Sequence, residues 1–138
     1  MATAALDPLR PIFRAPREGR AYDMPTMRAV FKADGAETAN RFSVSEWWLA
    51  PHSIGPGRHS HAANDELFLV IEGTASILVG DDWLEAPKGA FVMIPAGVEH
   101  DFENRTGERM GLFNVFLPGG FEQNMPAIVD WFRDHPSA

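Results

Sequence analysis

The sequence predicts an all-β domain that ends in one short helix. From about residue 27 onward, short apolar and β-branched runs are separated by turns that contain glycine and proline, a pattern typical of sandwiches and barrels. Near the C-terminus the apolar residues recur at helical spacing instead. The chain has 138 residues, of which 45% are hydrophobic. These values fit one globular domain with a single core.

The expected strands are defined by the turns that flank them. Residues 55–57, 87–89 and 95–97 are such turns, because their glycines and prolines supply the backbone angles that tight turns need. We expect strands at 27–33, 41–50, 58–62, 66–72, 74–79, 83–86, 90–94, 99–104 and 109–117.

Two of these strands predict how their side chains are oriented. In residues 99–104 acidic residues alternate with His100, Phe102 and Asn104. Successive strand side chains point to opposite faces, so these three should face inward and Asp101 should face water. Residues 67–71 are apolar throughout, so both faces of that strand should be covered. We expect a second subunit to cover the outer face, which makes the protein a homodimer.

One helix is expected after residue 120. Asn124 and Pro126 suit its N-cap and its first turn. Its apolar face at helical spacing consists of Phe121, Met125, Ile128, Val129 and Phe132. We expect this face to pack against the core and to close one side of the barrel.

Composition excludes several classes of protein. The chain has no cysteine, which rules out a disulfide scaffold, cysteine-ligated metal sites and a thiol nucleophile. The formal net charge is −7, and residues 59–138 carry 13 acidic but only 4 basic side chains, which argues against nucleic-acid binding. No apolar run is long enough to span a membrane. The N-terminus lacks the apolar stretch of a secretory signal, so we expect a cytoplasmic protein.

Residues 1–20 are expected to form an arm or tail, and residues 21–138 the single domain. The arm contains four arginines, but prolines at positions 8, 11 and 16 interrupt them, so an amphipathic targeting helix is not expected. We expect this segment to lie over a neighbouring chain or to stay mobile.

Three of the five histidines stand where they can share a metal ion. His59 and His61 form an i, i+2 pair, which on a strand aims both imidazoles at one face. Glu66 follows at the start of the next strand, and His100 faces inward from a later one. Three imidazoles and one carboxylate suit one divalent transition metal per chain: iron, manganese, nickel, cobalt, copper or zinc. Calcium and magnesium would want more oxygen ligands.

The sequence around these residues resembles the cupin superfamily. The first cupin motif runs through residues 56–61 and ends with Glu66 and Gly73. The second has the spacing G-x5-P-x-G-x2-H-x3-N, formed here by Gly89, Pro95, Gly97, His100 and Asn104. The one departure is Ser53, where the family has a glycine six residues before the first histidine.

This resemblance covers residues 40–117 and implies a double-stranded β-helix, that is, a jelly-roll barrel with the metal in its interior. It implies four metal ligands, which are His59, His61, Glu66 and His100. We expect Asn104 to hydrogen-bond a turn rather than to contact substrate, and Gly73 to sit at a turn that needs positive φ.

Within the cupins, the sequence is similar to the small quercetinase-like dioxygenases in residues 41–44, 65–73 and 117–122. This similarity implies that a substrate hydroxyl or enol binds the metal and that oxygen attacks the activated substrate. Glu66 would be the catalytic residue, as both ligand and proton acceptor. An apolar pocket suits a flat aromatic or small enolisable organic substrate. The pocket candidates are Glu46, Trp48, Phe68, Val70, Met93 and Phe102.

Two other functions stay open. The metal could act only as a Lewis acid, in an isomerase, lyase or decarboxylase. Such chemistry usually needs a second base, and the scarcity of candidates favours oxygen chemistry. Those candidates are Tyr22, Glu46, His52 and His135. The third function is non-enzymatic small-molecule binding, against which the retention of all four ligands argues.

Overall fold

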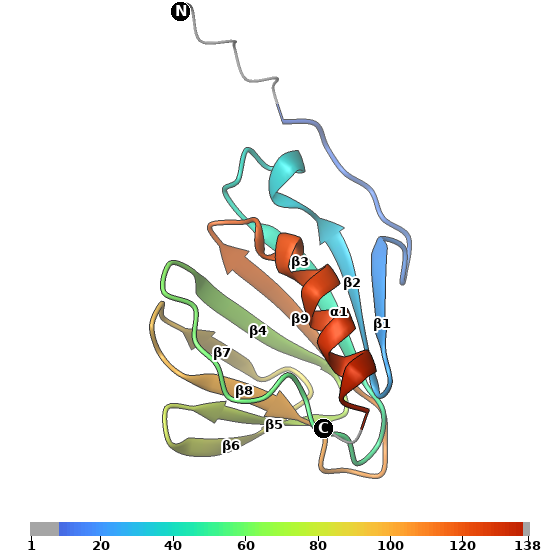
Figure 1. Ribbon diagram of the computed structural model, residues 1–138. Helices are drawn as coiled ribbons and strands as arrows, with labels where there is room; N and C mark the ends of the chain where they lie inside the picture. The colour runs from blue at the N-terminus through green and yellow to red at the C-terminus, as the bar shows by residue number, and fades with distance from the viewer. Residues whose placement is uncertain (1–8, 137–138) are drawn as a thin grey trace, which may run out of the picture.

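The computed structural model describes residues 9–136 and contains two β-sheets with one helix beside them (Figure 1). The strands are β1 Arg20–Met24, β2 Met27–Ala33, β3 Ser43–Leu49, β4 Asp65–Glu72, β5 Thr74–Val79, β6 Asp82–Pro87, β7 Phe91–Ile94, β8 His100–Glu103 and β9 Met110–Leu117. The helical elements are the 3-10 helices η1 Gly35–Glu37 and η2 Phe121–Asn124 and the α-helix α1 Met125–Asp134. Residues 1–8 of the predicted arm lie outside the described range.

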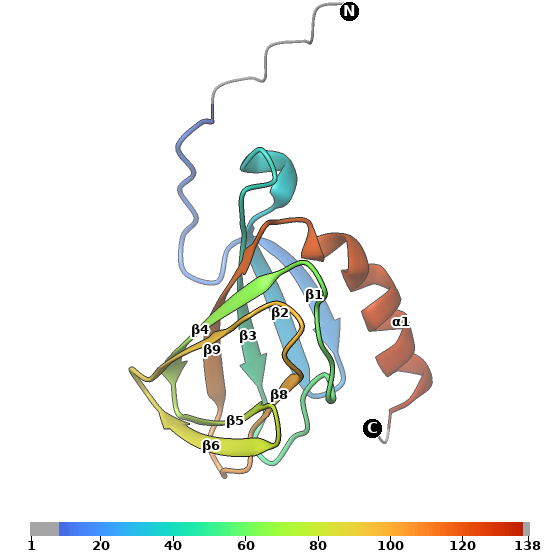
Figure 2. The same ribbon diagram turned by 90° about the vertical axis from the view of Figure 1, so that its left-hand side faces the viewer.

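The strands form two antiparallel sheets that face each other. The larger sheet has the order β1-β2-β3-β9-β4-β7, and the smaller one has the order β6-β5-β8. Figure 2 shows the two layers, with α1 beside the larger sheet. The two motif strands therefore lie in opposite layers, β4 in the larger sheet and β8 in the smaller. This arrangement confirms the predicted jelly roll with a short C-terminal helix.

The space between the sheets is filled by side chains from both layers. Phe68 and Val70 of β4, Phe102 of β8 and Leu112 of β9 are each at most 3% exposed. The rings of Phe68 and Phe102 meet across the two layers with their centroids 5.6 Å apart. Burial of each such side chain stabilises the fold by about 1.5–3 kcal/mol, so the core holds the two sheets at a fixed separation.

Two segments differ from the prediction. Residues 58–62, expected as a strand, contribute only one bridge between His59 and His100. Gly57, whose φ is 92°, turns the chain immediately before this segment. The strand β1 was not predicted, because most of its side chains are exposed and it lacks a repeating apolar pattern. It pairs with β2, and Tyr22 packs edge-on against Phe31.

The described part of the arm contacts the domain. Lys32 of β2 donates hydrogen bonds from Nζ to the carbonyl oxygens of Ala15 and Glu18, at 3.1 and 2.9 Å. Arg14 forms an ion pair with Glu37 at 2.8 Å. Within residues 9–136, no helix has the length and apolar character that crossing a membrane requires.

Candidate metal centre

The loop between β3 and β4 carries His59 and His61, and hydrogen bonds to the region of β8 fix its course. Ser53 and Asn104 exchange two backbone hydrogen bonds, both of 2.9 Å. His59 and His100 exchange two more, of 3.0 and 2.8 Å. Farther along, the amide of Gly97 donates to the carbonyl of His61 at 2.8 Å. These bonds bring two histidines of the first motif beside the histidine of the second.

Asn104 closes the turn that follows β8. Its amide nitrogen donates to the carbonyls of Ala50 and Glu108, at 3.0 and 2.6 Å. Its side-chain oxygen accepts from the amide of Thr106 at 3.0 Å. Asn104 therefore hydrogen-bonds a turn, as the sequence predicted.

The four predicted ligands meet at one point inside the barrel. One ligand atom from each of His59, His61, Glu66 and His100 lies within 4.8 Å of the others. The ring centroid of His59 lies 5.0 Å from that of His61 and 4.3 Å from that of His100. Oε2 of Glu66 lies 3.6 Å from Nε2 of His61 and is in closer contact with Nε2 of His100.

The donor atoms of this cluster fit a metal ion. Nε2 of His61, Nε2 of His100 and Oε2 of Glu66 are buried and make no hydrogen bond of normal geometry. Buried polar atoms almost always have a hydrogen-bond partner. Several buried nitrogen and oxygen atoms that converge without such partners therefore indicate that their lone pairs bind a cation. Three imidazole nitrogens with one carboxylate oxygen suit a divalent transition metal.

Hydrogen bonds behind the cluster orient its ligands. Nδ1 of His59 lies 2.5 Å from the carbonyl oxygen of Gly57, and Nδ1 of His100 lies 3.0 Å from that of Val98. These bonds assign the proton to Nδ1 and leave Nε2 free for a metal. Asn114 of β9 donates to Oε1 of Glu66 at 3.3 Å, which leaves Oε2 facing the histidines.

The surroundings shift the pKa values of the histidines in different directions. Burial lowers the pKa of His59 and of His61, so both rings are neutral at neutral pH and can bind a metal. Burial also acts to lower the pKa of His100, but its close contact with the negatively charged Glu66 outweighs burial, and the pKa is raised. A metal ion that binds here must therefore compete with the proton that this contact favours on His100.

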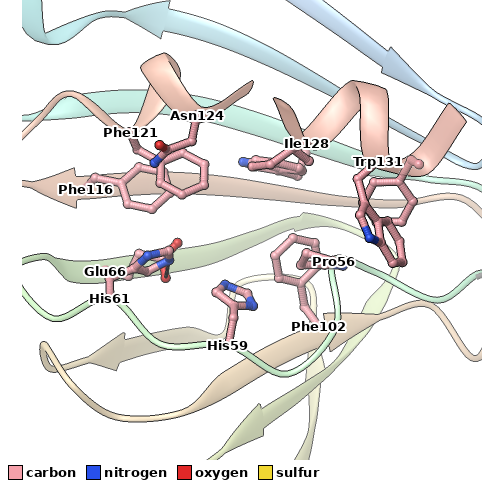
Figure 3. Close-up of a pocket in the computed structure, with 12 residues that line it drawn as sticks. Pro56, His59, His61, Glu66, Phe102, Phe116, Phe121, Asn124, Ile128 and Trp131 are labelled. Carbon is pink, nitrogen blue, oxygen red and sulfur yellow. Dashed lines mark ion pairs between the residues drawn. The ribbon is translucent and has the colours of Figure 1, made fainter. Parts of the chain in front are cut away.

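A cavity of about 330 Å³ opens directly on the cluster. We call it the α1 cavity, because one face of α1 forms its far wall (Figure 3). Its lining residues are Trp47, Pro56, His59, His61, Glu66, Phe102, Phe116, Phe121, Asn124, Ile128, Trp131 and Phe132. The cavity is mainly aromatic and has few polar groups, the usual character of a small-molecule site.

Of the predicted pocket residues, Phe102 lines the α1 cavity. Phe68 and Val70 are each 1% exposed and belong to the core beside it. The ring centroid of Phe68 lies 6.3 Å from that of His100. These two side chains therefore support the site from behind rather than line the cavity.

The prediction for Glu46 and Trp48 is wrong, because the parity of β3 is the opposite of the one expected. Trp47 points inward and lines the α1 cavity. Glu46 lies on the outer face and pairs with Lys32 at 3.3 Å. Trp48 lies on the same outer face, where Arg109 packs over its ring at 4.6 Å.

The prediction that Met93 lines the pocket is also wrong. It pairs with Leu67 in the ladder between β4 and β7. Both residues therefore occupy the outer face of the sheet, opposite to Glu66 and its partner Ile94. Met93 is 50% exposed and contributes nothing to the cavity.

Asp101 was expected to face water but is only 8% exposed. Its Oδ1 accepts hydrogen bonds from the amides of Gly57 and Phe102, at 3.1 and 2.8 Å. Burial raises the pKa of this carboxyl group. Asp101 thus ties the loop of His59 to β8, a contact between distant segments that strand periodicity could not reveal.

The wall formed by η2 and α1 was missed as part of the site. Phe121, Ile128 and Phe132 were interpreted as core packing, and the structure places all three on the cavity. Asn124 was interpreted as a helix cap, but its side chain makes no capping hydrogen bond. The helical spacing was a correct signal for the shared face, but it carries no information on whether that face meets a core or a cavity.

Comparison with solved structures places this fold among known ones. KdgF from Halomonas sp. superposes with a TM-score of 0.72 at 14% identity, over 83% of this chain and 99% of that one. A protein of Thermotoga maritima described as a predicted oxalate decarboxylase superposes with a TM-score of 0.64 at 16% identity, over 67% and 80% of the two chains. At these identities the likeness concerns the fold alone.

Sequence comparison gives the family. An uncharacterised protein of Streptomyces coelicolor, SCO3923, is 38% identical over 56 residues, which are 41% of this chain and 52% of that protein. The chain thus matches about half the length of that relative. Residues 45–116 match the family model of the cupin domain, a stretch that contains both histidine motifs and more than half of the chain. Because this match covers more than half of the chain and the fold agrees with it, the chain belongs to the cupin family.

Proposed function

We propose that this cupin is a metal-dependent dioxygenase that acts on a small aromatic or enolisable organic molecule. The observation that carries the proposal is the chemistry of the α1 cavity. Aromatic and aliphatic side chains form most of its wall, and its ionisable side chains are His59, His61 and Glu66. An apolar substrate with one metal-binding oxygen fits such a site.

The four candidates for a second base all lie away from the α1 cavity in the described part of the chain. Glu46 pairs with Lys32 on the outer face, and Tyr22 packs against Phe31 of β2. His52 is exposed in a loop, and His135 stacks on Trp131 after the end of α1. None of these four lines the α1 cavity, so proton transfer at the cluster falls to Glu66. This favours a reaction that needs one base over an isomerisation or elimination that usually needs two.

Glu66 has the geometry of a proton acceptor. Asn114 donates a hydrogen bond to its Oε1, while Oε2 faces His61 and His100. A bound divalent transition metal would supply an electrophilic centre that acidifies a substrate hydroxyl and, if redox-active, permits reaction with dioxygen. Oε2 would accept the hydroxyl proton and return it to the product, while both atoms of dioxygen enter the organic molecule and no other reductant is consumed.

The test is oxygen dependence. Protein is purified without added metal, its metal is identified by elemental analysis, and oxygen uptake is measured against a panel of flavonols, catechols and enolisable diketones. We expect a substrate whose turnover stops under anaerobic conditions and is not supported by zinc. Full anaerobic turnover would instead indicate a Lewis-acid isomerase, lyase or decarboxylase. Binding without turnover would indicate a small-molecule-binding protein.

A further inference from the structure

We propose that the α1 cavity binds the uncharged, flat aromatic body of the substrate and rejects ligands that carry a second anionic group there. The inference rests on the proposed function, because it places the metal-binding oxygen of the substrate at the cluster. It assigns specificity to one wall, which is formed by Asn124 at the end of η2 and by Ile128 and Trp131 of α1.

The cavity has two chemically distinct ends. His61 and Glu66 lie at one end and Trp131 of α1 lies at the other (Figure 3). Figure 3 shows Trp131 of α1 directed toward Pro56 and Phe102, at the end of the cavity away from His61 and Glu66. A ligand held at the cluster by an oxygen atom must therefore lay the rest of its body against α1.

The walls of the cavity suit a planar ring system. Phe116 and Phe121 are stacked, with centroids 4.2 Å apart and an interplanar angle of 8°. His61 meets this pair edge-on, 5.2 Å from Phe121. Trp47 and Phe102 meet edge-on at 5.7 Å. Aromatic rings pack best against faces and edges of this kind, and about 330 Å³ is enough for a body of roughly two fused rings.

Charge sets the second limit on the ligand. No lysine or arginine lines the cavity, and the α1 residue Arg133 is engaged by Asp130 at 3.1 Å. The protein as a whole carries a formal net charge of −7. An anionic group on the body of a ligand would thus be buried without a counterion, which is costly. The metal cluster is the one place in the cavity where an anion can be neutralised.

Asn124 is the neutral polar group of this wall. It occupies the N-cap position of α1, where asparagine ordinarily accepts a hydrogen bond from the first turn, yet its side chain makes no such bond. Figure 3 shows it above Phe116, at the side of the cavity. Position 124 is therefore the point where an added cation would change which ligands the cavity accepts.

The first experiment measures binding without turnover. The protein is loaded with Zn²⁺, and calorimetry compares catechol, 2,3-dihydroxynaphthalene and its 6-sulfonate, which share the same pair of metal-binding hydroxyls. We expect the two-ring diol to bind at least about tenfold more tightly than catechol, because the second ring buries more apolar surface. The sulfonate should bind at least about tenfold more weakly than its uncharged parent. Equal affinities for the diol and the sulfonate would overturn the inference.

The second experiment tests whether the wall of α1 is the cause. Asn124→Lys places a cation on the cavity, and we expect it to reduce the preference for the uncharged diol to less than about threefold. Gln123→Lys is the matched control, because Gln123 is exposed like Asn124 but does not line the cavity. It should leave the preference within about twofold of the wild type. An equal effect of both variants would show that net charge, not the wall, selects the ligand.

These outcomes are separate from those of the proposed function. A protein that shows the predicted selectivity but turns over without oxygen keeps this inference and loses the dioxygenase assignment. A protein that needs oxygen but binds the sulfonate as well as the diol keeps the assignment and loses the inference.

Discussion

At the scale of single residues, Glu66 is held so that its two oxygen atoms have different roles. The side chain is 3% exposed. Oε1 accepts a hydrogen bond from Asn114 at 3.3 Å, whereas Oε2 points at His61 and His100 without a normal hydrogen bond. One carboxylate can therefore offer a ligand atom and accept a proton while its orientation stays fixed.

The first prediction concerns the charge of this carboxylate. Glu66→Gln keeps the shape of the side chain but removes the proton acceptor, so turnover should fall by about a hundredfold to ten-thousandfold. Metal content should fall far less, because three imidazoles remain and the amide oxygen can still bind. Both quantities are measured on the same preparation. A variant that loses its metal but keeps its activity per bound metal would contradict a role for Glu66 in proton transfer.

The second prediction concerns Asn114, which is fully buried. Asn114→Leu removes the hydrogen bond that orients Glu66, and metal affinity should fall about 10- to 100-fold, as is usual when the partner of a ligand is lost. Competition with a chelator measures this affinity. Asn64→Leu is the control, because it also removes a side-chain hydrogen bond, to the carbonyl of Pro118, at a position outside the cluster. An equal loss in both variants would mean that Asn114 acts only through general stability.

At the scale of elements, the loop between β3 and β4 lies very close to β8. A Cβ atom added at Gly55 would overlap the carbonyl oxygen of Phe102. The ligands His59 and His61 follow on the same loop, and the backbone hydrogen bonds of His59 to His100 depend on its course. Close packing of this loop is thus a condition for assembling the cluster.

The third prediction follows from that contact. Gly55→Ala should lower the free energy of unfolding by about 1–3 kcal/mol, the usual cost of forcing extra atoms into a packed site. It should also weaken metal binding, because the loop must move. Gly107→Ala is the control, since its added Cβ would lie 3.6 Å from the nearest atom, Nε2 of His52, which is a normal van der Waals distance. Denaturant melts and metal titrations check both variants. A Gly55→Ala variant that is destabilised but binds metal with unchanged affinity would show that assembly of the cluster does not depend on the packing of this loop.

The ligand cluster could be predicted from sequence because its positions are set by local turns. Gly73, for example, has φ of 69°, and the tight turn there joins β4 to β5. Such turns leave characteristic spacings of glycine and proline in the sequence. The four ligand positions lie within those spacings, so they could be named without knowledge of the packing.

The orientation of β3 could not be predicted in this way. The strand turns Ser43 and Ser45 inward, where apolar residues are normally expected. Ser43 is satisfied there by Glu122 at 2.7 Å, and Ser45 contacts Asn114 at 3.2 Å. These partners come from segments more than sixty residues away in the sequence. Non-local hydrogen bonds thus decide the parity of the strand, and with it whether Trp47 or Trp48 meets the cavity.

At the scale of the whole molecule, the outer face of the larger sheet is apolar and exposed in a single chain. Leu69 of β4 is 38% exposed, while Phe91 and Met93 of β7 are 62% and 50% exposed. The strand β7 lies at the edge of the sheet. Exposed apolar residues that adjoin one another in a sheet often mark a protein interface.

The fourth prediction is that a second copy of the chain covers this face, which we call the β4–β7 face. Sedimentation at micromolar concentration should give about twice the chain mass of 15.3 kDa. Met93→Glu should shift the protein toward the monomer, because a charge would be buried in the interface. Leu84→Glu is the control, since Leu84 is 43% exposed but lies on β6 of the other sheet. A monomeric wild type would contradict the homodimer.

The central claim is that His59, His61, Glu66 and His100 hold one divalent transition metal, and its most direct test is metal content. Protein purified without added metal is analysed for its elements, and we predict one transition metal ion per chain. His100→Ala should abolish stoichiometric metal, whereas His135→Ala, at an exposed position after α1, should keep the wild-type amount. A His100→Ala protein that folds and retains metal at the wild-type level would contradict the four-ligand site.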